Sequence, residues 1–221
     1  MPRAPPCDDA RGMNIYLSPQ AGTITTAGPR RGTPNRLVRL TGIGALVAAL
    51  ITASPAIASA DGPRAAGASA SCAGASTSTV NMNRFRTAIA CLHDSERSRH
   101  GMRRDLRWNR DLSRAAVKHA RDMVRRHYFE HVSPNGRDHM DRIAAGGYRP
   151  SAGSWSAGEN LFFSRGRTTP RQLFSAWMHS SAHRANIMRS GWRDFGLGVV
   201  QTSPYGEPKG LTVVVLFGKR G

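Results

Sequence analysis

Apolar residues recur every three to four positions through the first half of the region between residues 80 and 221, which is the spacing of one helix face. Between residues 80 and 100 one helix face, opposite several arginines, carries Val80, Phe85, Ile89 and Leu92. From 110 to 126, behind a candidate N-cap at Asn109, the same spacing gives Leu112, Ala115, Ala116, Ala120 and Met123. Both segments are predicted to be helices that bury one face.

Toward the C-terminus the pattern changes to strands. Residues 157–163 form a strand candidate, and 195–201 and 211–217 alternate or run apolar, with Pro204-Tyr205-Gly206 in the turn between them. Shorter helices are predicted over 138–145, ending at Gly146-Gly147, and over 170–178, with Pro170 at the first helical position. Helices first and an antiparallel hairpin last predict an α+β domain whose helices cover the sheet.

The N-terminal segment has the three parts of a secretory signal. Arginines precede an uncharged apolar run from Leu40 to Ala53, and Ala58-Ser59-Ala60 follows as a cleavage site. The run is shorter than the roughly 20 residues of a transmembrane helix; a buried helix or a membrane anchor is the alternative. We therefore predict a leader over 1–60, with Met13 as an alternative start, a flexible tail over 61–79 and one folded domain over 80–221. The mature protein is expected outside the cell or in its envelope, without a transmembrane helix.

Three cysteines are present, and Cys7 would leave with the leader. Cys72 and Cys91 then remain, and two cysteines in an exported protein pair more often than they stay reduced. A bridge between them would close a loop of about 20 residues and stabilise the fold by about 3 kcal/mol. Two free thiols are the alternative.

The charge is extreme, with 32 basic and 14 acidic residues and a formal net charge of +18. Residues 1–60 hold six arginines and two aspartates, so 26 basic and 12 acidic residues remain after Ala60. Such a surface attracts anionic partners, for example cell-envelope polymers or acidic lipids. No base-reading motif accompanies the arginines, so nucleic acid is not the expected partner.

Candidate chemistry centres on three residues from separate segments. His131 leaves a predicted helix end into a turn, and His183 stands in His183-Arg184-Ala185-Asn186-Ile187. Glu159 lies in a largely apolar strand, where a carboxylate needs a partner. A nearby imidazole or cation would supply one; a purely structural role for Glu159, accepting backbone hydrogen bonds, is the alternative.

His127-Tyr128-Phe129-Glu130-His131 also matches H-x-x-E-H, a zinc-peptidase motif. On one helix the two histidines would share a face and could bind zinc together. The turn-forming Ser133-Pro134-Asn135-Gly136 follows at once, so little helix remains to hold both ligands. We therefore do not favour a peptidase of this kind.

Four ordered blocks between residues 84 and 218 resemble the bacterial branch of the CAP superfamily, the cysteine-rich secretory, antigen 5 and pathogenesis-related proteins. The blocks are Leu112 to Met123; Tyr128 to Gly136; Asp141-Arg142-Ile143 with Gly147-Tyr148 and Gly158-Glu159-Asn160-Leu161; and Trp177-Met178, His183 to Ile187 and Gly196-Leu197-Gly198-Val199. The resemblance implies a three-layer α-β-α sandwich with a central antiparallel sheet. It also implies a cleft lined by His131 and Glu159 that holds a divalent metal, often zinc.

The chain departs from the family pattern at two positions. Secreted eukaryotic members have a second glutamate three residues after the helix tryptophan, where this chain has Ser180 after Trp177. His183 takes the place of the second histidine by analogy of position. The expected cleft residues are therefore His131, Glu159, His183 and Ser180, with His131 and His183 as metal ligands and Glu159 nearby.

Two functions follow from these expectations, with a third that does not need the cleft. The first is a monomeric, exported, non-enzymatic binding module for a lipid, glycan or envelope component, dependent on a divalent cation. The second is a secreted hydrolase in which His131 or His183 is general base and a serine or a metal-bound water attacks. The third is an adhesive surface protein whose arginines bind anionic polymers.

Overall fold

The computed structural model describes residues 15–16, 25–27, 72–78, 81–102, 106–150 and 152–221. Its helices are α1 (Met82–Arg99), α2 (Arg110–Arg126), α3 (His139–Ala145), α4 (Pro170–His179) and α5 (Ser181–Ile187). Its strands are β1 (Ile15–Tyr16), β2 (Thr25–Ala27), β3 (Arg107–Trp108), β4 (Trp155–Ser164), β5 (Asp194–Val200) and β6 (Leu211–Arg220). All belong to one unit made of residues 1–29 and 70–221.

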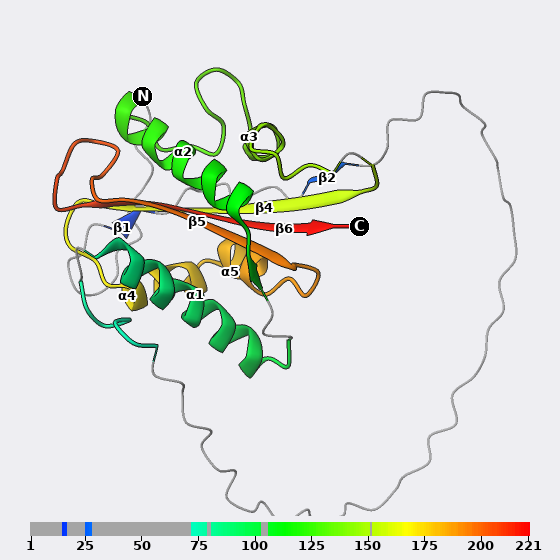
Figure 1. The fold of residues 1–221 in the computed structure, drawn as a ribbon. Helices are drawn as coiled ribbons and strands as arrows, with labels where there is room; N and C mark the ends of the chain where they lie inside the picture. The colour runs from blue at the N-terminus through cyan, green and yellow to red at the C-terminus, as the bar shows by residue number, and fades with distance from the viewer. Residues whose placement is uncertain (1–14, 17–24, 28–71, 79–80, 103–105, 151) are drawn as a thin grey trace, which may run out of the picture. The chain divides into compact units, whose positions relative to one another are not determined.

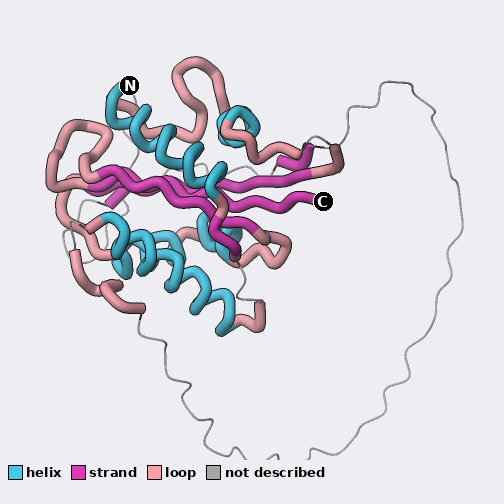
Figure 2. The backbone as a smooth tube through the Cα atoms, viewed as in Figure 1, coloured by secondary structure: helices cyan, strands magenta, loops and turns pink. Residues whose placement is uncertain are grey.

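The sheet has the order β1-β4-β6-β5-β3, and β2 also pairs with β4. Strands β4, β6 and β5 are antiparallel, whereas the short β3 runs parallel to β5. Helices α2 and α3 cover one face of this sheet, and α1, α4 and α5 cover the other (Figures 1 and 2). The three-layer α-β-α sandwich with a central antiparallel sheet is therefore confirmed.

Alternation along β6 builds a separate core on each face of the sheet. Val213, Val215 and Phe217 pack toward α1, α4 and α5, while Val214 and Leu216 pack toward α2 and α3. Successive strand residues point to opposite faces, so one apolar run fills both cores. None of the helices among the described residues combines the length and apolar character needed to cross a membrane.

Helix α2 packs close to the sheet because β5 presents two glycines to it. A Cβ atom added at Gly196 would come 2.4 Å from the Leu112 Cβ, and one at Gly198 would come 2.4 Å from the Ala116 carbonyl carbon. Neither position leaves room for a side chain. The small residues of α2 and the Gly-x-Gly of β5 therefore fix the distance between this helix and the strand.

The helix ends follow the caps expected from the sequence. Asn109 accepts hydrogen bonds from the backbone N–H groups of Asp111 and Leu112, so α2 begins at Arg110 as predicted. Thr169 and Gln172 form a reciprocal capping box at α4, with Pro170 in the first turn. Helix α5 and strand β3 were not predicted; both are short and carry little periodic signal.

The predicted disulfide is confirmed. Cys72 and Cys91 are bonded with a Cα–Cα distance of 5.6 Å, and the bond ties the segment before α1 to the helix.

Strands β1 and β2 were not predicted, because they fall in the expected leader. They pair with one edge of β4, opposite residues 163–164 and 155–157. The predicted apolar signal segment, Leu40 to Ala53, and the cleavage site lie outside the described residues.

His93 of α1 is fully buried in the core between the sheet and the layer of α1 and α4. It lies 4.9 to 5.8 Å, centroid to centroid, from four aromatic rings, those of Phe174, Trp177, Phe195 and Phe217. Its Nδ1 donates to the Ile89 carbonyl at 2.8 Å, and its Nε2 is buried without a hydrogen-bond partner among the described residues. Burial lowers the pKa of His93 to about 4 because the charged form cannot be solvated there.

Replacing Gly198 by Ala should destabilise the protein by about 2 to 3 kcal/mol, because the added methyl group forces α2 away from β5. Gly166 provides a matched control: its position has nothing within 4 Å, so Gly166→Ala should change stability by less than about 0.5 kcal/mol. Urea unfolding at pH 7 measures both. Equal effects at the two positions would contradict the close approach of α2.

The stability of the fold should fall in acid, in part through His93. The imidazole titrates near 6.5 when unfolded and near 4 when folded, so its contribution is complete above pH 6.5 and is lost as pH falls to 4. The loss is on the order of 3 kcal/mol. Unfolding of the wild type and of His93→Leu, measured from pH 7.5 to 4, should converge or cross in acid. A constant difference between the two curves would refute this.

Candidate functional site: a buried histidine and glutamate cluster

Glu159 has no exposed surface although it stands in the middle of β4. His131 Nδ1 donates to its Oε1 at 2.8 Å, and Arg142 donates to Oε1 at 3.0 Å and to Oε2 at 2.9 Å. Both carboxylate oxygens are therefore satisfied, one of them twice. The expected approach of His131 and Glu159 is confirmed, and the side chain of Glu159 has a cation bound to both oxygens as well.

Arg142 connects the site to its surroundings. From α3 it donates to the His131 carbonyl at 2.8 Å, to the Arg137 carbonyl at 2.8 Å and to Ser133 Oγ at 3.1 Å. One guanidinium thus holds the loop that carries His131 as well as the carboxylate. Sequence reasoning missed this role. The available signal was the demand of a buried carboxylate for a cation, but the sequence does not tell which arginine supplies it.

The environment keeps Glu159 ionised. Burial on its own would raise the pKa of the carboxyl, but charge on His119, the charge of Arg142 and the hydrogen bond from His131 outweigh it and hold the pKa well below the usual range. Arg142 is the permanent charge among these, since burial lowers the pKa of His119 itself to about 4. A carboxylate held in this way is a poor proton acceptor and is suited to orienting His131.

His131 is brought to Glu159 by the way α2 ends. The helix stops at His127, which adopts a left-handed conformation (φ 56°, ψ 48°), and the chain then leaves the helix axis. His127 Nδ1 hydrogen-bonds to the Pro204 carbonyl at 3.0 Å, away from Glu159. His127 and His131 therefore share no helix face, and the H-x-x-E-H interpretation is excluded by the backbone.

His183 comes from α5, on the other side of the sheet. Its Nδ1 lies 2.7 Å from Ser180 Oγ, and its Nε2 is buried with no hydrogen-bond partner in the described part of the chain. Burial, and then the charge of the nearby His131, lowers the pKa of His183 to about 4. The imidazole is therefore neutral at physiological pH, the form that can bind a metal.

Two asparagines fix α5 against β4. Asn186 donates to the Glu159 carbonyl at 3.2 Å and to Asn160 Oδ1 at 3.0 Å, and Asn160 donates to the His183 carbonyl at 3.1 Å. Trp192 completes the network by donating its indole N–H to the Asn186 carbonyl. The His-Arg-Ala-Asn-Ile block thus positions His183 through Asn186.

The donor atoms only partly fit a metal ion. His131 Nε2 and His183 Nε2 are both buried and unpaired within the described residues, while Glu159 is occupied by Arg142 and His131. No three His, Cys, Asp or Glu side chains among the described residues are grouped to hold a metal. Two imidazoles with water as further ligands are what the chain can offer zinc, and the metal remains a prediction.

The three side chains expected to line a cleft are buried. His131, Glu159 and His183 are 7%, 0% and 1% exposed. A hollow of about 840 Å³ beside α2 is lined by Ser133 and Arg142, which both contact the cluster or its loop, but not by these three side chains. The structure brings His131 and Glu159 into contact and places His183 on α5, and the role of the three residues in binding stays a prediction.

Comparison with known proteins agrees with this architecture. The profile of the CAP, or cysteine-rich secretory protein, family matches residues 81–217. The chain belongs to this family. It is 30% identical over 122 residues to the uncharacterized protein YkwD of Bacillus subtilis (strain 168), an alignment that covers 55% of this chain and 45% of YkwD. The chain thus spans less than half of the length of that relative.

Two solved structures are similar in fold. An outer surface protein from Borrelia burgdorferi matches with a TM-score of 0.54 and 18% identity, over 64% of this chain and 97% of that one. An extracellular protein containing an SCP domain from Bacillus anthracis matches with a TM-score of 0.48 and 23% identity, over 63% and 44%. At 18% identity the likeness to the Borrelia protein concerns the CAP fold alone.

Removing Arg142 should leave Glu159 buried and uncompensated. We expect Arg142→Met to cost about 3 to 5 kcal/mol of stability, and a second substitution, Glu159→Leu, to recover much of that loss. The control is Arg99→Met: Arg99 pairs with Glu96 but its side chain is 57% exposed, so the cost should stay below about 1 kcal/mol. A double variant less stable than Arg142→Met would contradict the pairing.

Proposed function

We propose that this CAP-domain protein is an exported binding module that holds a divalent cation through His131 and His183 and binds a lipid or glycan of the cell envelope. The observation that carries the proposal is the pair of buried imidazole Nε2 atoms without hydrogen-bond partners among the described residues. A buried polar atom without a hydrogen-bond partner needs an explanation, and a bound ion is one of them.

The remaining contacts of the two imidazoles suit this role. Glu159 accepts from His131 Nδ1, and Ser180 Oγ lies within hydrogen-bond distance of His183 Nδ1. A partner on one ring nitrogen fixes the ring and directs the other nitrogen toward a metal. When bound, zinc would supply a Lewis-acidic centre with open positions for an oxygen of the ligand.

Export and an envelope ligand rest on different observations. The signal-like segment before Ala60 and the Cys72–Cys91 bridge both favour work outside the cytoplasm. The excess of basic residues that remains after Ala60, 26 against 12 acidic ones, favours an anionic ligand.

A hydrolase is the second candidate, favoured by the 2.7 Å contact between Ser180 Oγ and His183 Nδ1. A serine beside a neutral imidazole is the beginning of a nucleophile and base pair. In the described residues, however, no acidic side chain contacts His183 to orient it, and the serine is only three positions away on the same helix end. We therefore rank binding first.

Zinc titration of the full-length protein, stripped with chelator and followed by calorimetry, tests the proposal. His131→Ala and His183→Ala should each remove most binding, and Glu159→Gln should weaken it about 10- to 100-fold. His127→Ala is the matched control and should bind as the wild type does, because its ring faces Pro204. Unfolding curves exclude loss of fold.

Zinc binding unchanged in both histidine variants would overturn the metal proposal. Hydrolysis of a chromogenic ester that disappears in Ser180→Ala, with zinc binding intact, would favour the hydrolase instead.

A further inference from the structure

The outer face of α2 carries a continuous row of cations. Arg110, Arg114, Lys118, Arg121 and Arg125 are spaced by four, four, three and four residues, so they lie on one helix face, and all five are exposed. At 1.5 Å per residue the row is about 22 Å long. The opposite face of α2 is buried against the sheet.

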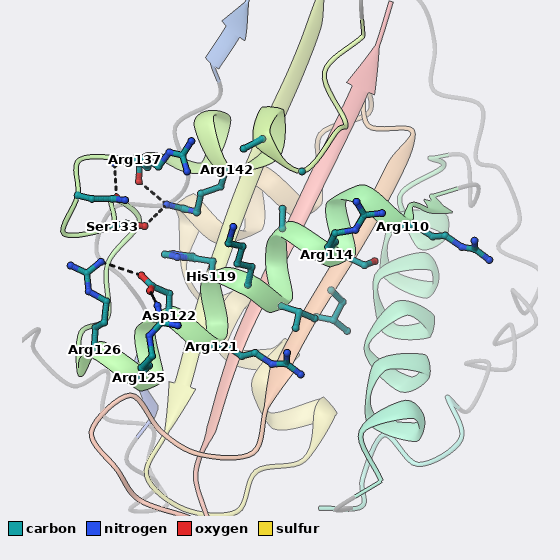
Figure 3. Close-up of a pocket in the computed structure, with 18 of the residues that line it drawn as sticks. Arg110, Arg114, His119, Arg121, Asp122, Arg125, Arg126, Ser133, Arg137 and Arg142 are labelled. Atoms are coloured by element: carbon teal, nitrogen blue, oxygen red, sulfur yellow. Dashed lines mark hydrogen bonds and ion pairs between the residues drawn. The ribbon is translucent and has the colours of Figure 1, made fainter.

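This row lines the hollow of about 840 Å³ beside α2. Figure 3 shows Arg110, Arg114, Arg121 and Arg125 projecting from the helix, with Arg137 and Arg142 on the side of α3. Further lining cations are Arg86, Lys118 and Arg126, whereas the lining includes one acid, Asp122. The surface is therefore concave and almost entirely of one sign.

Neighbouring acidic side chains neutralise only part of this positive charge. Asp122 binds Arg125 and Arg126, and Asp111 lies 3.3 Å from Arg114. Within the described residues, Arg110, Lys118 and Arg121 form no ion pair. An anion in the hollow would meet at least three uncompensated cations.

Repulsion between the cations of the row lowers the stability of α2. Like charges three and four residues apart destabilise a helix by about 0.2 to 0.5 kcal/mol per pair, and α2 has four such pairs in succession. Surfaces that serve solubility alone mix both signs. A same-sign row on a helix that packs well on its other side is the pattern of an electrostatic binding site.

Trp108 adds a second kind of contact at one end of the row. It precedes the N-cap of α2, lines the same hollow and is 49% exposed. Its ring lies 5.7 Å from that of Phe195, which supports it from the sheet. An exposed indole beside cations offers a flat apolar surface on which a sugar ring can stack, while the cations bind the acidic groups of that sugar.

We propose that the hollow along α2 binds a linear acidic polysaccharide, with Arg110, Lys118 and Arg121 on its anionic groups and Trp108 on a sugar ring. A concave row suits a chain better than a flat bilayer, and Trp108 is the one large apolar side chain that the lining exposes for insertion into lipid. A single tryptophan offers no series of stacking platforms for bases. The hollow shares Arg142 and Ser133 with the surroundings of the histidine cluster, but the proposed contacts use neither His131 nor His183 and need no metal.

The test uses the full-length protein and a fluorescent oligogalacturonate long enough to span α2. The variant Arg110→Gln/Lys118→Gln/Arg121→Gln should weaken binding at least about tenfold and lower the slope of log Kd against log salt by about two to three. The matched control, Arg84→Gln/Arg99→Gln/Arg171→Gln, removes the same charge from exposed arginines of α1 and α4 on the other face of the sheet. Its binding should change less than about threefold.

Trp108→Ala separates sugar recognition from charge. It should weaken oligogalacturonate binding several-fold while leaving binding of inorganic polyphosphate unchanged. Equal losses in the two triple variants would overturn the site, because net charge alone would then explain binding. Tighter binding to phosphatidylglycerol vesicles or to an oligothymidylate than to the oligosaccharide would overturn the ligand class. Zinc removal should leave all of these affinities unchanged, which keeps a failure here distinct from a failure at His131 and His183.

Discussion

The burial of the Glu159 carboxylate is the constraint around which this site is organised. A charge with no exposed surface is tolerated only with partners in good geometry, and here Arg142 and His131 occupy both oxygens. Arg142 reaches the carboxylate from α3, and it also donates hydrogen bonds to the Arg137 and His131 carbonyls in the loop after α2. The path of that loop and the orientation of His131 therefore depend on one ion pair.

Strand β4 joins the two helical layers at this point. Glu159 and Asn160 are neighbours, so their side chains point to opposite faces; the first contacts the layer of α2 and α3, and the second contacts α5 through His183 and Asn186. His131 and His183 come from different layers, and both are held to this strand, His131 by Glu159 and His183 by Asn160. A fold without the sheet between the helices could not assemble the cluster.

Much of the fold and of the site was predictable from the sequence, and the elements and contacts that were missed have physical causes. Helix α2 was predicted close to its observed bounds because the cap and the apolar period agree over 17 positions. Helix α5 and strand β3 are too short for periodicity, and β1 and β2 arise because the edge of β4 offers unpaired backbone groups to any extended segment. His131 and Glu159 could be paired from the cost of a buried carboxylate, but choosing Arg142 requires the tertiary path of the loop.

The two faces of α2 explain how binding chemistry can be added to a fixed fold. The inner face is determined by Gly196 and Gly198, which bring the helix so close to β5 that only small or well-fitted residues are tolerated. Packing places no such demand on the outer face, so its residues can change without altering the architecture. Repulsion within the row opposes the ion pairs that Arg114 and Arg125 form with Asp111 and Asp122, so the row adds little to helix stability. The proposed ligand gives the row a role that the fold does not, and the sandwich serves as its rigid support.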